Sequence, residues 1–141
     1  MNKSFLIINA NYYRDISSGL LKSAISLIPK RCKIKIINVP GVFEIPVTIS
    51  KNLKKFDAFI ALGCVIKGET PHFDFISQAS TNAIMKLSIE SRKPIGNGII
   101  TCLNMKQAKA RKKKGAEAAN AILSILSQKW KLHLVRRIIL E

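Results

Sequence analysis

Acidic and aromatic residues are scarce in this chain of 141 residues, and long apolar runs are absent. Only 8 Asp and Glu stand against 24 Lys and Arg, and aromatic residues make up 6% of the sequence. No stretch approaches the roughly 20 apolar residues that span a bilayer. The start of the chain also lacks an apolar segment followed by a small-residue cleavage site. We therefore expect a cytoplasmic protein that makes no contact with a membrane.

Cysteine is sparse as well. Cys32, Cys64 and Cys102 are far apart in the sequence, and none of them belongs to a CxxC pair. Zinc sites and redox dithiols usually show that spacing, and an odd number of cysteines does not suit a fully paired disulfide framework. We expect three reduced thiols and no metal site.

The shortage of acids leaves a formal net charge of +16, a level at which nucleic-acid binding has to be considered. The one local cluster is KQAKARKKK at residues 106–114. Such a run either binds phosphate groups or forms a solvated face. It contains no aromatic residue on which a base could stack. We expect no specific nucleic-acid partner, and a basic RNA-binding module remains the alternative interpretation.

Apolar residues, which make up 48% of the chain, are sufficient for the core of one domain over residues 1–141. Four apolar runs predict strands, and the segments between them have helical spacing. The strands are expected at residues 5–9, 33–39, 58–62 and 98–101, and the helices at 16–28, 44–54, 75–87 and 115–130, with a short turn before the last helix. This alternation predicts an α/β fold: a three-layer flavodoxin-like sandwich with a four-stranded parallel sheet and helices on both faces.

Open α/β sheets bind ligands at the carboxyl ends of their strands. Chemically specific residues gather in the loops that are expected there: residues 11–13 after the first strand, 40–44 after the second and 64–72 after the third. Loops that only closed the chain would need fewer such groups. We expect the functional site at this edge of the sheet.

The loop after the third strand is the most informative segment. Thr70 followed by Pro71 has the form of a helix N-cap with proline at the first helical position. The unpaired amides of a helix start favour anions, so Gly68, Glu69 and Thr70 could cradle a phosphate. An ordinary strand-to-helix turn is the other interpretation of the same residues.

Three further side chains have both a functional and a structural interpretation. His72 stands beside the proposed anion and could exchange protons near neutral pH, or it could be a structural histidine. Glu44 could accept hydrogen bonds from a polar substrate, or it could complement a helix dipole. Tyr12 could stack on a heterocycle, or it could pack in the core.

Four stretches resemble the signature segments of lumazine synthases, and they occur in that family's order. They are VPGVFEIP (39–46), ALGCVIKGETPHFDFIS (61–77), IGNGIITCLNMKQA (95–108) and KKGAEAANA (113–121). The resemblance extends over residues 5–126, and the second stretch is the most specific. It implies an enzyme that condenses 5-amino-6-(D-ribitylamino)uracil with 3,4-dihydroxy-2-butanone 4-phosphate, without a cofactor. The implied product is 6,7-dimethyl-8-ribityllumazine.

The resemblance also implies roles for individual residues. His72 would move protons, Tyr12 would stack on the pyrimidine, and the sugar phosphate would be held by Glu69, Thr70 and Arg111. The remaining implied contacts to the ribitylaminouracil are Val42, Phe43, Glu44, Cys64, Val65, Ile66 and Asn97. Asn97 matches a position that reaches the site from an adjacent subunit. The protein should therefore be a homo-oligomer with active sites at its interfaces.

Three departures from the family bear on these expectations. The segment between Gln107 and Gly115 is shorter than usual, so either Arg111 or Lys114 takes the place of the family's phosphate-binding arginine. No segment precedes the first strand to add a strand to a neighbour, which favours a pentamer over a sixty-subunit shell. The tail at 129–141 is unusually basic and apolar. A non-catalytic flavin- or lumazine-binding relative is the second alternative.

Overall fold

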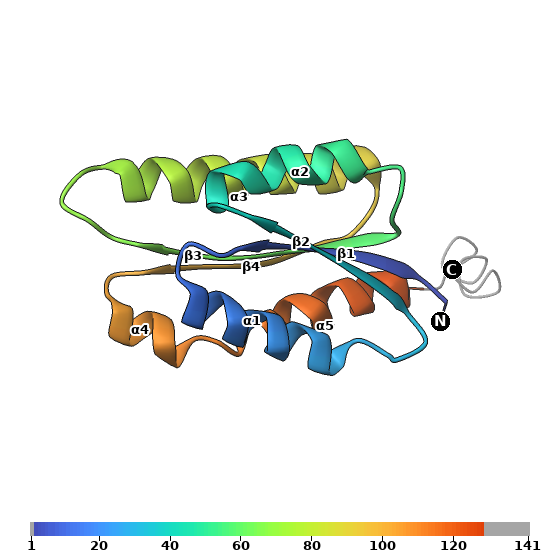
Figure 1. Cartoon of the computed structure of the whole chain (residues 1–141). Coiled ribbons are helices and arrows are strands. Elements are labelled where there is room, and N and C mark those ends of the chain that lie inside the picture. Colours follow the sequence, from blue (N-terminus) through green and yellow to red (C-terminus); the bar gives the residue numbers. More distant parts are fainter. Residues whose placement is uncertain (1, 129–141) are drawn as a thin grey trace, which may run out of the picture.

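The computed structural model describes residues 2–128 and shows a sheet between two layers of helices (Figure 1). The strands are β1 (Ser4–Ala10), β2 (Lys33–Val39), β3 (Ala58–Ile66) and β4 (Ile95–Cys102). The helices are α1 (Arg14–Leu27), α2 (Ile45–Asn52), α3 (His72–Ser91), α4 (Met105–Ala110) and α5 (Lys114–Leu126), with one 3-10 turn, η1 (Val42–Glu44).

All strand pairs are parallel, and the strand order is β2-β1-β3-β4. The two central strands are rich in Ile, Leu, Phe and Ala and are buried along almost their whole length. Strands that are covered on both faces carry such continuous apolar runs because both sides of the pleat face a core. The expected four-stranded α/β sandwich is confirmed.

Alternate strand residues enter two separate cores. Phe5 and Ile7 of β1 pack with side chains of α1 and α5 on one face of the sheet. Leu6 and Ile8 pack with side chains of α2 and α3 on the other face. Figure 1 shows α4 on the same side as α1 and α5. The period of two along a strand thus provides both inner layers from one run of apolar residues.

Helices α1 and α5 approach each other closely at Gly115. A Cβ atom at this position would lie 2.0 Å from the backbone oxygen of Leu20, so only glycine fits without a shift of the backbone. The Ser23 hydroxyl of α1 accepts a hydrogen bond from the Ala116 amide at 2.8 Å. These two contacts fix the start of α5, and with it Lys114, against α1.

The structure differs from the expected elements at several of their ends. Strand β3 runs four residues further than predicted because residues 63–66 pair with residues 99–102 of β4. Cys64, Val65 and Ile66 therefore lie on a strand and not in a loop. Helix α2 begins only at Ile45, after η1, and α5 ends at Leu126. The predicted end of that last helix, residue 130, and the basic tail lie outside the described residues.

The turn that was expected before the last helix contains α4. Its cap is visible in the structure: the Asn104 side chain accepts from the Gln107 amide at 2.9 Å, and the Gln107 side chain accepts from the Leu103 amide at 2.8 Å. Asparagine followed three residues later by glutamine is a helix-start signature that sequence inspection missed. The lysine cluster is therefore partly helical. None of the helices within residues 2–128 combines the length and apolarity needed to cross a membrane.

Candidate active site at the β1–β3 switch point

The strand order reverses between β1 and β3, because the chain passes from β1 to β2 on one side and from β3 to β4 on the other. A cavity of about 750 Å³ opens at the carboxyl ends of these strands, and we call it the switch-point cavity. Ligand sites of open α/β sheets occur at this place. Eight of the predicted site residues line it together: Tyr12, Val42, Phe43, Glu44, Cys64, Val65, Ile66 and His72.

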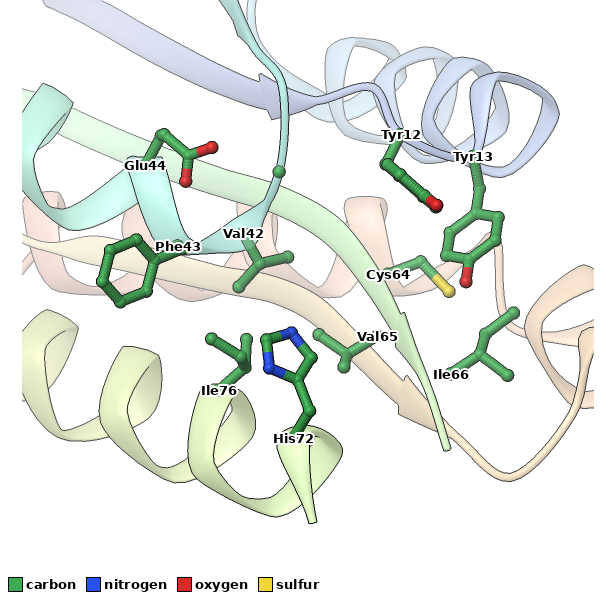
Figure 2. Close-up of a pocket in the computed structure, with 11 residues that line it drawn as sticks. Tyr12, Tyr13, Val42, Phe43, Glu44, Cys64, Val65, Ile66, His72 and Ile76 are labelled. Carbon is green, nitrogen blue, oxygen red and sulfur yellow. The ribbon is translucent and has the colours of Figure 1, made fainter. Parts of the chain in front are cut away.

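Two adjacent tyrosines that follow β1 form one wall of the cavity (Figure 2). Tyr12 is 75% exposed, so simple core packing does not account for it. Its ring meets the ring of Tyr13 edge-on, with centroids 4.9 Å apart and planes at 81°. This leaves the Tyr12 ring available to a flat ligand.

The segment after β2 forms the opposite wall. Val42 is buried over Gly63, where an added Cβ would lie 2.8 Å from the Val42 Cγ2 atom. Phe43 is 71% exposed. Glu44 begins the approach to α2, but its side chain makes no capping hydrogen bond. Within residues 2–128 we find no hydrogen bond or ion pair of the Glu44 carboxylate, so this acceptor is available to a ligand.

The end of β3 forms the floor. Cys64 and Ile66 point to the α1 side of the sheet and belong to that core, whereas Val65 belongs to the α2–α3 core. Burial raises the pKa of the Cys64 thiol to about 12, and the neighbouring Cys102 adds to the shift. The thiol is therefore protonated at neutral pH and is not the thiolate that nucleophilic catalysis needs.

His72 is the first residue of α3, and its ring points into the cavity beside Val65 and Ile76 (Figure 2). The residue is exposed, so it is not a histidine of the core. Pro71 is the N-cap, and not the first helical residue as predicted. The Thr70 hydroxyl accepts from the His72 amide at 3.4 Å, which is a long hydrogen bond. The imidazole is thus held at the helix start and left open to a ligand.

The predicted phosphate cradle lies outside the cavity lining. Gly68, Glu69 and Thr70 are exposed, and no heavy atom lies within 4 Å of a Cβ built at Gly68. Neither Glu69 nor Thr70 lines this cavity or the one described next. Their role in phosphate binding stays a prediction.

The remaining predicted residues, Asn97 and Arg111, lie in a second cavity of about 620 Å³. It follows the outer edge of β4, and we call it the β4-edge cavity. Arg111 donates to the Thr101 carbonyl at 3.2 Å, and the Asn97 side chain accepts from the Ile99 amide at 3.1 Å. Lys114 also lines this cavity and forms an ion pair with Glu117 at 3.2 Å. In a single subunit, the cations and His72 are therefore in different cavities.

Sequence inspection missed several residues of both cavities. Tyr13 and Ile76 line the switch-point cavity, and Lys113 and Glu117 line the β4-edge cavity. Ile76 follows His72 by four residues, which places both on the same side of a helix. The sequence offered no separate reason to select Tyr13, because the stacking hypothesis needed one aromatic ring and its neighbour Tyr12 provided it. Within residues 2–128, no group of three or more His, Cys, Asp or Glu could hold a metal ion.

Comparison with known proteins gives concordant matches. A family model described as 6,7-dimethyl-8-ribityllumazine synthase matches residues 2–129. A protein of that name from Bartonella bacilliformis is 41% identical over 139 residues, covering 92% of this chain and 91% of the relative. Proteins of the same name from Bartonella henselae and Agrobacterium fabrum are 44% and 41% identical, covering 88% and 90% of this chain and 86% and 95% of the relatives.

Proposed function

Because the chain belongs to the 6,7-dimethyl-8-ribityllumazine synthase family, we propose that its switch-point cavity condenses 5-amino-6-(D-ribitylamino)uracil with 3,4-dihydroxy-2-butanone 4-phosphate. The products are 6,7-dimethyl-8-ribityllumazine, phosphate and water. The enzyme is a transferase of riboflavin biosynthesis and acts at the penultimate step. One observation carries the assignment to this cavity: it brings together residues that follow β1 and β2, the last residues of β3 and the imidazole at the start of α3.

The aminouracil occupies the larger, apolar part of the cavity. Its ring stacks on the exposed face of Tyr12, and backbone groups of Cys64, Val65 and Ile66 bind its polar edge. Phe43 and Val42 enclose the ribityl chain, and the free Glu44 carboxylate accepts hydrogen bonds from its hydroxyls. A carboxylate acceptor makes stronger hydrogen bonds than a neutral one, which fixes the orientation of the substrate.

His72 transfers protons between the reacting groups. The amine of the uracil attacks the ketone, and water is lost to give an imine. Phosphate is then eliminated, and the ring closes with loss of a second water. Because each step consists largely of proton transfer between bound molecules, one imidazole with correct positioning is sufficient.

The sugar phosphate lies between two subunits. Backbone amides of Glu69 and Thr70 at the start of α3 bind the phosphate from one side. Arg111 of a neighbouring subunit binds it from the other, with Asn97 of that subunit completing the aminouracil site. Support for this arrangement is that Arg111 and Asn97 share the β4-edge cavity and are absent from the lining of the switch-point cavity. Lys114, in the same cavity, is the alternative to Arg111.

A heterologous contact of this kind closes into a ring when the rotation between neighbouring subunits divides the full turn evenly. The ring is a pentamer, as the family resemblance implies, and it works in the cytoplasm. A shell of twelve such rings would place many subunits of +16 charge side by side, and their repulsion disfavours it at low salt. Sedimentation at moderate salt should give a species of about five chain masses. A particle in the megadalton range that persists on dilution would contradict the isolated ring.

The assay for the proposed function uses the purified protein with both substrates. Absorbance and fluorescence of the lumazine should appear faster than in the uncatalysed mixture, and inorganic phosphate should be released in step. A non-catalytic lumazine-binding relative would bind the product but would leave the rate at the background level. An RNA-binding module is not favoured, because the family match covers nearly the whole chain.

A further inference from the structure

Tyr13 is the one polar aromatic residue of the switch-point cavity to which the proposed reaction gives no role. It lines the cavity beside Cys64 and Ile66, and its ring packs against the α1–α5 core. Its backbone carbonyl accepts from the Ser17 amide at 2.9 Å, within the first turn of α1. The start of the helix and the core thus fix Tyr13 from two sides, unlike the exposed Tyr12.

The contact between the two tyrosines makes one depend on the other. Tyr12 is largely exposed, and its one aromatic contact within residues 2–128 is the edge-on contact with Tyr13. Edge-to-face pairs are favoured because the positive edge of one ring meets the negative face of the other. Tyr13 therefore restricts the orientation of the Tyr12 ring before any ligand arrives. A stacking surface that is already oriented loses less conformational entropy on binding.

The Tyr13 hydroxyl is a free donor. We find no hydrogen bond from it within residues 2–128, and Figure 2 shows it directed toward Cys64 and Ile66 at the floor of the cavity. Burial raises the pKa of Tyr13 above its ordinary value, with smaller contributions from Tyr12 and Cys64, so the phenol stays protonated. A ligand that covers this floor removes water from the hydroxyl. An unpaired hydroxyl is then costly, so the ligand has to provide an acceptor.

We propose that Tyr13 is a positioning residue for the heteroaromatic substrate: its ring orients Tyr12 for stacking, and its hydroxyl donates a hydrogen bond to an acceptor of the stacked ring system. The inference rests on the proposed function, because it concerns the aminouracil site of that reaction. It assigns the ring recognition to a pair of tyrosines and not to Tyr12 alone. The sugar phosphate makes no contact with this pair.

Two substitutions separate the ring from the hydroxyl. Tyr13→Phe keeps the edge-on packing and removes only the donor, so the KM for the aminouracil should rise about 3- to 10-fold with kcat and the KM for the sugar phosphate unchanged. Tyr13→Leu keeps apolar packing against the core but removes the aromatic ring that contacts Tyr12, so it should raise the same KM by about a further 3- to 10-fold. Fluorescence titration with the lumazine product should give parallel changes in its dissociation constant. Circular dichroism and sedimentation verify folding and assembly of each variant.

The Tyr12→Ala background tests the coupling. Without the Tyr12 ring, Tyr13→Leu should raise the KM for the aminouracil little more than Tyr13→Phe does. If Tyr13→Leu exceeds Tyr13→Phe in its effect on this KM by the same factor with and without the Tyr12 ring, the orienting role is overturned. An unchanged aminouracil KM in Tyr13→Phe overturns the hydrogen bond. Equal changes in the KM of both substrates would show a merely structural role. If the unmodified protein makes no lumazine, the proposed function fails, whereas normal turnover with unaffected Tyr13 variants defeats only this inference.

Discussion

The two cavities of this chain differ in their position on the sheet and in the chemistry of their linings. The switch-point cavity lies over the centre of the sheet, has walls of Tyr, Phe, Val and Ile side chains, and contains a single imidazole. The β4-edge cavity lies at the margin and contains Arg111, Lys113 and Lys114. The first suits a flat heterocycle, and the second suits a phosphate group. The two substrates of the proposed reaction divide in the same way.

This difference follows from the sheet. The central strands are buried on both faces, so the residues at their carboxyl ends are mainly apolar. Within residues 2–128, β4 pairs only with β3, and its free side exposes polar residues such as Asn97 and Thr101. Within residues 2–128, the stacking surfaces and these cations therefore lie in different cavities. A second copy that places its β4 edge against the switch-point cavity can bring them together.

The largest expected effect is on the chemical step, in the switch-point cavity. His72→Ala should lower kcat about 100-fold, the low end of the range for an acid–base group, because the substrates also react without the enzyme. The exposed side chain packs in neither core, so sedimentation and thermal unfolding should be unchanged. A normal kcat in a correctly assembled variant would remove His72 from proton transfer.

The next largest effect concerns the β4-edge cavity, and it should leave the KM for the aminouracil unchanged. Arg111→Ala should raise the KM for the sugar phosphate about 10- to 100-fold, as expected for a lost charge-assisted contact. Lys114→Ala is the matched variant, since this lysine lies in the same cavity and is already paired with Glu117. A larger effect from Lys114→Ala would transfer the phosphate contact to that residue. If neither variant changes this KM, the two cavities do not cooperate.

The smallest effects on activity come from two glycines that support the two cavities differently. A methyl group at Gly63 would meet the side chains of Val42 and Ala10, and Val42 lines the switch-point cavity, which offers space for its displaced side chain. Gly63→Ala should therefore raise the aminouracil KM about 2- to 5-fold with little loss of stability. A methyl group at Gly115 would meet the Leu20 backbone oxygen. Gly115→Ala should lower the free energy of unfolding by about 1–3 kcal/mol, measured in urea. Equal destabilisation by both would contradict this contrast.

The sheet could be predicted from the sequence because its strands coincide with clear apolar or alternating runs. The range 33–39 was predicted as it is found, since its alternation ends at Pro40. Strand β3 was cut short at residue 62 because Gly63 resembles a turn residue, whereas in the structure it lies in the strand under Val42. Helix α4 was missed because its lysines obscured the Asn104–Gln107 cap. Local pattern thus predicts the existence of an element better than its end.

The site was partly predictable for the same reason. Residues at the carboxyl ends of neighbouring parallel strands have to meet at one edge of the sheet, so Tyr12, Glu44 and Cys64 could be grouped from the sequence. Arg111 could not be assigned to a cavity in this way. Its position depends on the packing of α4 and α5 and on its hydrogen bond to the Thr101 carbonyl. Those contacts arise only from the tertiary structure.

In the proposed enzyme, each active site combines the switch-point cavity of one subunit with the β4-edge cavity of the next. Mixed rings of His72→Ala and Arg111→Ala subunits test it, co-expressed with different tags and purified through both. Assays below the sugar-phosphate KM keep the Arg111 defect visible. Each variant alone serves as the baseline, and rings of the double variant with unmodified subunits serve as the control.

If the site is shared, an intact site forms only where a subunit that retains His72 contributes its switch-point cavity and a neighbour that retains Arg111 contributes its β4-edge cavity. In random rings of the two single variants, this is the case at about a quarter of the interfaces. The rings with the double variant should also show about a quarter of full activity. If each subunit instead contained its whole site, the single-variant mixture would stay at the baseline and the control would show about half. We expect equal recovery in both mixtures; no recovery in the first, with half activity in the second, would contradict a site shared between subunits.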